Sequence, residues 1–371
     1  MNCFAMKMWK VLLLAAGVAI FSLLPLASSA RKRASATVIR QLERDTPGLM
    51  KSYGVPGVSM ALIQRGETTW VHAFGIKEAN KQQPVTQATV FEAASLSKPV
   101  FAYGVLELVE EGKLGLDVPL TAYLSKPYVE GDDRLAKITA RIVLSHRTGF
   151  PNWRDKDSLT IYFSPGDRFS YSGEGYVYLQ RVVEQITGKP LNDYMTEAVF
   201  EPLGMTSSSY IWRKDFDELT ATGHDSDGKP QELWKPNEAG AASTLNTTAR
   251  DYARFVQAVL NEKGLKPSTF REMETPQVAL DPDCRICIKQ EPKQLSNNLF
   301  WGLGWGIQRK DGREMLWHWG DNGSFKAFVM SEPKSKSGVV MFANSQKGLD
   351  LAKPLIEQAM GQEVLAFGWL K

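Results

Sequence analysis

Residues 91–116, FEAASLSKPVFAYGVLELVEEGKLGL, place a lysine where a helix normally avoids one. The apolar residues after Ser95 recur at helical spacing and Gly112 is a natural stop, so the stretch predicts a long helix. Lys98 would lie in its first turn, beside N–H groups whose partial positive charge disfavours a cation. Ser95 and Lys98 are three residues apart and share one face. An unfavourable lysine next to a hydroxyl suggests a chemical role.

Strand-like segments lie at both ends of the chain, with helical segments between them. This order predicts an α+β fold, in which both ends form one antiparallel sheet with flanking helices and a mainly helical domain is inserted. We expect the sheet subdomain at about 37–94 and 296–371 and the helical subdomain at about 95–295. The segments with strand character are two within 57–75 and four more at 300–308, 313–320, 325–332 and 337–344.

The first 30 residues differ in composition from the rest. Lys7 and Lys10 precede an apolar run over residues 11–27, and small residues at 28–30 offer a cleavage point, as in a secretory signal. An uncleaved anchor is the alternative, because basic residues at 31–33 would hinder cleavage and the run approaches the length of a membrane span. Either interpretation predicts an exported region, 31–371, that is periplasmic or extracellular. Membrane contact is expected only through residues 11–27, if they are retained.

Charge and cysteine content exclude several classes of function. The chain carries a net charge of +3, which falls to +1 without Lys7 and Lys10, and no basic block suggests a nucleic-acid partner. Cys284 and Cys287 are expected to form a local disulfide in an oxidising compartment, with two free thiols as the alternative. No further zinc ligands lie nearby, and the Pro- and Asp-rich surroundings do not fit a thioredoxin-like motif.

Three stretches together suggest serine hydrolysis. Burial and the helix end would lower the pKa of Lys98, so that a neutral amine could take the proton of Ser95. In FSYSGEGYVYLQ, Tyr171 lies in a turn before a helix, and a neighbouring ammonium would lower the pKa of this phenol. In MLWHWGDNGSFKAF, residues 318–320 read as an edge strand, where Gly320 would admit a substrate backbone. No Gly-x-Ser-x-Gly elbow is present, which disfavours an α/β-hydrolase.

The ordered motifs Ser95-x-x-Lys98, Tyr171-Ser172-Gly173 and His318-Trp319-Gly320 resemble those of the serine β-lactamase and penicillin-binding-protein superfamily. The resemblance covers nearly all of residues 37–365 and is nearest to the class C branch, which includes D,D-peptidases and esterases. Further matching stretches are VPGVSMALIQRG, LSHRTGFPNW, EPLGM and AGAASTLNTTARDYARF.

The resemblance implies a β-lactamase-like fold and a role for each motif. Ser95 would be the acylated nucleophile, and Lys98 and Tyr171 would move its proton, with the choice of base left open. His318 would orient Tyr171 and the substrate. The N–H groups of Ser95 and Asp321 would hold the oxyanion. The implied mechanism needs no cofactor and no metal ion.

Two departures from the family pattern bear on the substrate. Gly173 replaces the asparagine of the usual Tyr-x-Asn, and His-Trp-Gly replaces Lys-Thr-Gly, so that Trp319 would crowd the strand. We expect Trp153 and Trp319 to be pocket walls, and His146 to order a turn. These departures favour an esterase or a D-amino-acid peptidase acting on a small ester, amide or peptide. A class C-type β-lactamase and a non-hydrolytic penicillin-binding sensor remain the alternatives.

Overall fold

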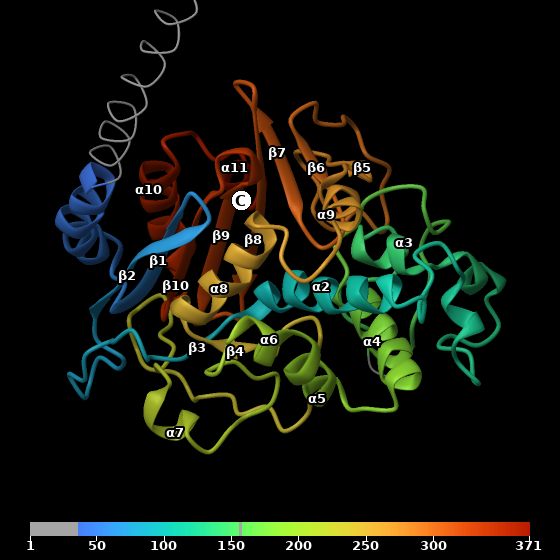
Figure 1. Cartoon of the computed structure of the whole chain (residues 1–371), viewed down its shortest axis with the longest axis horizontal. Helices are drawn as coiled ribbons and strands as arrows, with labels where there is room; N and C mark the ends of the chain where they lie inside the picture. The colour runs from blue at the N-terminus through green and yellow to red at the C-terminus, as the bar shows by residue number, and fades with distance from the viewer. Residues whose placement is uncertain (1–35, 156–157) are drawn as a thin grey trace, which may run out of the picture. The chain divides into compact units, whose positions relative to one another are not determined.

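The computed structural model describes residues 36–155 and 158–371 (Figure 1). Residues 36–45 are helical and belong to a unit of their own, whereas residues 46–371 form a second unit, which contains every strand of the described ranges. The signal or anchor predicted in residues 1–30 lies outside the described residues. None of the helices in the described ranges combines the length and apolar character that a membrane span requires.

An eight-stranded antiparallel sheet runs through the second unit in the order β2-β1-β10-β9-β8-β7-β6-β5. Its centre joins segments that are far apart in sequence, because Val58 of β1 lies opposite Ala343 of β10. The α+β prediction, with a sheet built from both chain ends, is confirmed. The strands are β1 Gly57–Gln64, β2 Glu67–Gly75, β5 Val278–Ala279, β6 Leu299–Trp301, β7 Gly306–Lys310, β8 Arg313–Asp321, β9 Lys326–Glu332 and β10 Ser337–Ala343.

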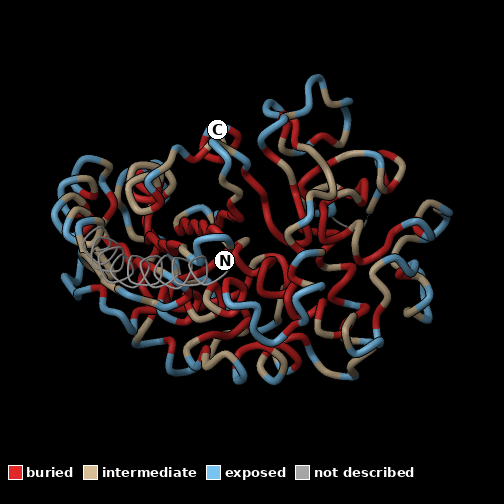
Figure 2. Tube along the Cα trace, turned by 45° about the horizontal axis from the view of Figure 1, so that its top comes forward, coloured by how far each residue is buried: buried red, intermediate tan, exposed pale blue. Residues whose placement is uncertain are grey.

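The central strands are covered on both faces. Successive residues of a strand point to opposite faces, and in β10 Phe342 contacts Tyr252 of helix α8, Ala249–Leu260. Its neighbour Ala343 instead lies against Gly348, which opens helix α10, Gly348–Met360. A strand buried between two helix layers needs apolar residues at nearly every position, which explains the runs in 325–332 and 337–344. Figure 2 shows these central segments as buried.

Helix α2, Ser97–Glu110, crosses the middle of the unit and is buried on almost every side (Figure 1). A helix that is apolar all round belongs in the interior of a protein. It is reached through the short strand β3, Phe91–Glu92, which pairs with β4, Asn246–Thr247. The remaining α-helices are α3 Ala140–Leu144, α4 Gly173–Thr187, α5 Leu191–Met195, α6 Glu201–Leu203, α7 Phe216–Leu219, α9 Pro267–Glu274 and α11 Ala366–Trp369.

The prediction that residues 318–320 lie on an edge strand is wrong for the strand as a whole. In the described sheet β8 is an inner strand between β7 and β9. However, the β7 pairing ends at Trp317, opposite Gly306, and residues 318–321 pair with β9 alone. The end of β8 therefore retains one side that β7 does not cover, because β7 is the shorter strand.

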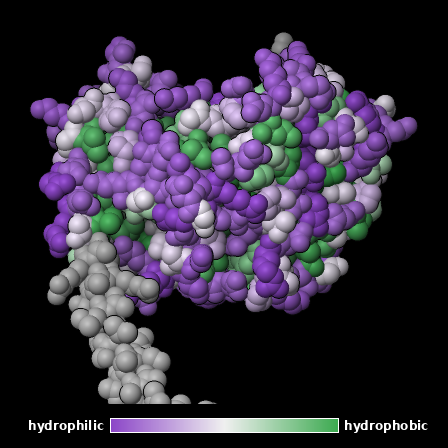
Figure 3. Space-filling view, turned by 90° about the horizontal axis from the view of Figure 1, so that it is seen from above, coloured by the Kyte–Doolittle hydropathy of each residue, from purple (hydrophilic) through white to green (hydrophobic). Residues whose placement is uncertain are grey.

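The surface combines polar residues with scattered apolar ones. The face seen in Figure 3 is mostly hydrophilic, and its apolar residues gather in separate small patches. Scattered apolar residues are normal on a soluble surface and indicate no partner by themselves.

Candidate active site

Ser95 lies in a 3₁₀ turn, η1, Ala94–Leu96, that connects β3 to α2. Ala94 has a φ of 50°, a left-handed conformation that a non-glycine residue rarely adopts and that packing must hold in place. Ala94 and Leu96 are fully buried, whereas Ser95 is only partly buried. The turn therefore holds the Ser95 hydroxyl on a rigid support and keeps it accessible.

Lys98 follows in the first turn of α2 and is fully buried. Its Nζ donates to Ser95 Oγ at 3.0 Å and to the carbonyl oxygen of Ala242 at 2.8 Å. No carboxylate forms an ion pair with Lys98 among the described residues, and burial lowers the pKa of this amine well below its ordinary value. The lowering of the Lys98 pKa by burial agrees with the expectation, and the role of the amine as proton acceptor stays a prediction.

Tyr171 lies just before α4, whose N-terminus is capped by Ser172. The phenol ring is buried, and its centroid is 4.8 Å from Lys98 Nζ. The Tyr171 hydroxyl is close enough to Ser95 for the serine to lower the pKa of the phenol, but it forms no hydrogen bond of normal geometry with any described residue. Burial raises the pKa of Tyr171, and the interactions with Ser95 and Arg285 offset this only in part. The expectation of a low-pKa phenol is therefore wrong, because burial favours the neutral forms of both Tyr171 and Lys98.

His318 completes the set on β8. Its Nδ1 lies 2.8 Å from the carbonyl oxygen of Trp319 and therefore carries the proton, which leaves Nε2 as an acceptor. Nε2 is buried and has no partner among the described residues. Burial, assisted by the charge of Lys98, lowers the pKa of His318 to about 3. The imidazole is therefore neutral at physiological pH, and its acceptor nitrogen has no partner within the described ranges.

Gly320 brings β8 against the segment that carries the nucleophile. A Cβ atom at this position would lie 2.3 Å from the carbonyl oxygen of Ala93. The glycine is therefore required for the approach of two protein segments, and the approach of a substrate backbone at this position stays a prediction. Asp321 ends the strand; it is exposed and its carboxylate pairs with Lys326.

The two tryptophans predicted as pocket walls differ in exposure. Trp319 is only 5% exposed and its ring packs 4.7 Å from that of Tyr171, so it supports the tyrosine rather than forming an open wall. Trp153 is 49% exposed and lies over Gly173, where a Cβ atom would come within 2.7 Å of the indole. The tryptophan ring thus occupies space that an asparagine side chain at position 173 would need.

A disulfide loop that sequence reasoning did not connect to the site lies against Tyr171. Cys284 and Cys287 are joined in the expected local disulfide. Between them, the Arg285 carbonyl accepts the Tyr171 N–H at 2.9 Å. The Arg285 guanidinium donates to the Leu370 carbonyl and lies 5.8 Å above the Trp319 ring. Only the two cysteines marked this loop in the sequence, and they gave no information about its neighbour.

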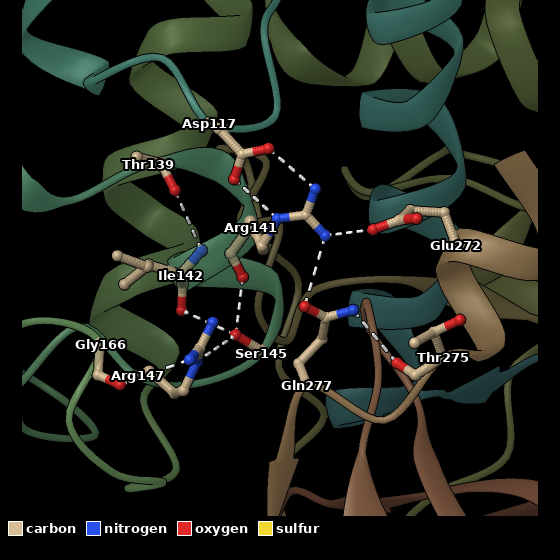
Figure 4. A network of polar contacts seen from close by, with 10 residues as sticks. All are labelled: Asp117, Thr139, Arg141, Ile142, Ser145, Arg147, Gly166, Glu272, Thr275 and Gln277. Carbon is tan, nitrogen blue, oxygen red and sulfur yellow. Dashed lines mark hydrogen bonds and ion pairs between the residues drawn. The ribbon is translucent and has the colours of Figure 1, made fainter.

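A polar network holds the turn after α3 (Figure 4). The Arg141 guanidinium donates to carboxylates from two other parts of the chain, and the Ser145 hydroxyl donates to the Arg141 carbonyl while accepting from Arg147. His146 lies within this turn and is buried against Tyr171, with ring centroids 4.3 Å apart. The partners of the Arg141 guanidinium are Asp117, Glu272 and Gln277.

The chemistry-bearing side chains therefore meet from separate elements. Ser95 and Lys98 come from η1 and α2, Tyr171 from the start of α4, and His318 from β8. In the described ranges, no group of three or more His, Cys, Asp or Glu side chains is arranged to hold a metal ion.

Comparisons with known proteins identify related sequences over most of the chain. A family model described as Beta-lactamase matches residues 42–360. The chain is 26% identical over 367 residues to unguisins hydrolase ungD of Aspergillus violaceofuscus (86% of this chain, 64% of that protein). It is 25% identical over 337 residues to penicillin-binding protein 4 of Amycolatopsis lactamdurans (85% and 87%). It spans less than two thirds of the length of several curated relatives.

The fold has solved counterparts as well. The crystal structure of D-alanine carboxypeptidase AmpC from Burkholderia cenocepacia matches with a TM-score of 0.74 at 21% identity, over 88% of this chain and 99% of that chain. At this level of identity the match shows a common fold.

Proposed function

Because the chain belongs to the Beta-lactamase family, we propose that it is a serine hydrolase that forms an acyl-enzyme on Ser95. One observation carries the proposal: the buried Lys98 amine lies 3.0 Å from a partly accessible Ser95 hydroxyl, and no carboxylate of the described ranges pairs with it. A nucleophile within hydrogen-bond distance of an amine whose pKa is lowered by burial is an arrangement suited to acyl transfer.

In the proposed reaction, Ser95 Oγ attacks a carbonyl carbon as its proton passes to the Lys98 amine. The N–H groups of Ser95 and Asp321 would stabilise the oxyanion. Tyr171, a neutral phenol at rest, is suited to relay the proton onward to the leaving group. The free Nε2 of His318 would accept a hydrogen bond from the substrate or from the phenol. Water then attacks the ester on Ser95, and the proton transfers run in reverse.

The wall formed by Trp153 and Gly173 supports esters or amides with apolar acyl groups as substrates. An exposed indole face offers apolar contact and no amide, and the close fit of Gly173 beneath the ring excludes the asparagine of the usual motif. The Trp153 loop is anchored next to this glycine, since Arg154 forms an ion pair with the buried Glu174. Small esters and D-amino-acid peptides therefore fit better than β-lactams.

The test compares the full-length protein with Ser95→Ala. Hydrolysis of p-nitrophenyl esters with short and aromatic acyl groups, of D-alanyl peptides and of a chromogenic cephalosporin would be followed together, with mass spectrometry of the intact protein. We expect ester or peptide turnover that falls at least about 10³-fold in Ser95→Ala. Ser59→Ala is the matched control, because Ser59 is a buried serine on β1 whose hydroxyl has no partner in the described structure.

The outcomes separate the possible functions. Cephalosporin turnover exceeding ester turnover would instead assign a β-lactamase. A stoichiometric adduct on Ser95 without turnover would assign a penicillin-binding sensor. The absence of both turnover and adduct would contradict the assignment of Ser95.

We also propose that the protein acts outside the cytoplasm, on the basis of the composition of residues 1–30. Cell fractionation and the mass of the isolated protein would test this. A protein that begins near residue 31 indicates cleavage, and an intact membrane-associated protein indicates an anchor.

A further inference from the structure

His146 accepts backbone hydrogen bonds from the residues on both sides of Tyr171. Its carbonyl oxygen accepts the N–H of Ser170 at 2.9 Å, and its Nδ1 accepts the N–H of Ser172 at 3.0 Å. His146 itself is fully buried and has a φ of 55°, the left-handed conformation. Both neighbours of the tyrosine are thus hydrogen-bonded to a single residue, whose backbone is held in an uncommon conformation.

The imidazole also contacts the tyrosine ring directly. The ring centroids of His146 and Tyr171 are 4.3 Å apart, and on other sides the imidazole meets Tyr176 and Trp301, each at 5.1 Å. Trp319 lies against Tyr171 as well, at 4.7 Å. With aromatic rings packed around it, the phenol has little freedom to change its direction.

The protonation state of His146 is set by its contacts. Because Nδ1 accepts from a backbone N–H, the proton must lie on Nε2, which has no hydrogen-bond partner among the described residues. The titratable groups that affect it are Lys98 and His318. Burial is the main cause that lowers the pKa of His146 well below its ordinary value. Positive charge on Lys98 or His318 lowers it further. The ring stays neutral, so the Nδ1 acceptor is preserved across the physiological range.

We propose that His146 is a positioning residue for Tyr171, which fixes the phenol against Ser95 and Lys98 through two backbone hydrogen bonds and one ring contact. The polar network around Arg141 in Figure 4 holds the turn from which His146 acts. The kinetic consequence of this proposal rests on the proposed function, whereas its structural consequence does not.

Two substitutions separate the contributions of the imidazole. His146→Asn keeps an acceptor for the Ser172 N–H and tolerates a left-handed backbone, but removes the ring. His146→Phe keeps a ring and removes the acceptor. His224→Asn is the matched control: His224 is also a fully buried histidine, which accepts the Ala79 N–H and lies 2.8 Å from the Asn344 carbonyl oxygen, away from the site.

For p-nitrophenyl ester hydrolysis we expect kcat to fall about 10- to 100-fold in both His146 variants while KM changes less than about threefold. The acid limb of the kcat–pH profile should move to higher pH, because water admitted beside Lys98 raises the pKa of the amine toward its ordinary value. His224→Asn should lower Tm without moving either quantity. Unchanged kcat and pH profile in both variants, with active wild-type protein, would overturn the inference.

A measurement without turnover keeps the inference testable if the wild-type protein hydrolyses nothing. In protein labelled with ¹³Cζ-tyrosine, the signal lost in Tyr171→Phe identifies Tyr171. We expect this signal to shift and broaden in both His146 variants and to stay unchanged in His224→Asn. An unaltered Tyr171 signal in the His146 variants would contradict the positioning role, whereas an inactive wild type with an altered signal would contradict only the proposed function.

Discussion

The inner and outer parts of the site are built in different ways. The inner part, Ser95, Lys98 and Tyr171, is held by buried side chains and short contacts from α2, α4 and β8. The outer part consists of the exposed Trp153, which lies over the buried Gly173, and of the disulfide loop around the partly exposed Arg285. The inner part keeps the residue types of the family motifs, and the outer part departs from them.

This difference indicates that the inner part determines reactivity and the outer part determines which substrate is bound. A neutral lysine requires complete removal from water and from counter-charges, which only a closed interior supplies. Recognition of an acyl group requires a surface that the substrate can reach, so it is confined to partly exposed residues. Substitutions in the inner part should therefore change kcat, and those in the outer part should change the choice of substrate and KM.

The largest effect is expected from Lys98. Lys98→Arg retains a cation that does not lose its proton in proteins, and Lys98→Met retains apolar bulk without an amine. Both should lower kcat for ester hydrolysis by at least about 10³-fold. Single-turnover acylation, measured by quenched mass spectrometry, checks the result. If Lys98→Arg kept wild-type acylation, the amine could not be the proton acceptor, and the inner part would lose its proposed chemistry.

Gly320→Ala should have the next largest effect. The added Cβ would lie 2.3 Å from the Ala93 carbonyl oxygen, so β8 must move away from η1. We expect a loss of about 2 kcal/mol in the free energy of unfolding and about a tenfold loss of kcat. Gly48→Ala serves as the control, because Gly48 is helical and a Cβ there meets nothing within 4 Å. Equal stability and kcat in the two variants would show that β8 and η1 are loosely joined.

Glu92, which directly precedes Ala93, should make the stability of the protein depend on pH. The Glu92 carboxyl is buried on β3 and accepts from Asn322, and burial raises its pKa to about 7. A carboxyl that binds its proton more tightly in the folded state makes the protein less stable as pH rises from about 4.5 to 7. Glu92→Gln should therefore stabilise the protein by about 1 to 3 kcal/mol at pH 8 and hardly at all at pH 4.5. Urea unfolding at both pH values measures this; equal gains at both would mean that Glu92 does not titrate as described.

The smallest effect is expected from the disulfide loop. Reduction of the Cys284–Cys287 bond frees the loop that carries Arg285, but does not touch Lys98 or Ser95. We expect KM to rise about two- to fivefold while labelling of Ser95 by a fluorophosphonate continues. The double variant Cys284→Ser with Cys287→Ser, with and without reductant, is the control. A large loss of kcat on reduction would place the loop in the inner part of the site.

Local patterns in the sequence predicted the parts of the site that depend on spacing along the chain. Ser95 and Lys98 are three residues apart, so their contact followed from helix geometry, and the strand pattern at both ends predicted the sheet. The errors came from contacts between distant segments. Tyr171 is buried against Trp301 and Trp319, which lie more than a hundred residues further along the chain, and burial reversed the expected pKa shift of the phenol.

Two contributors could not be predicted, because their contacts with the Tyr171 segment leave no local pattern in the sequence. Arg285 reaches Tyr171 through a backbone hydrogen bond, which leaves no side-chain pattern to read. His146 was noticed only as a residue that orders a turn, because its second partner lies 26 positions along the chain.

The pairing of β1 with β10 has a consequence for the order of events in folding. The strands are separated by more than 270 residues, so the middle of the sheet forms late, after a large loss of chain entropy. A chain that has been synthesised only as far as β7 contains Ser95 and Lys98, but it lacks His318 and the rest of β8, which packs against the segment before η1. Reactivity at Ser95 should then arise in one step with completion of the sheet, which makes labelling of that serine a reporter of the last stage of folding.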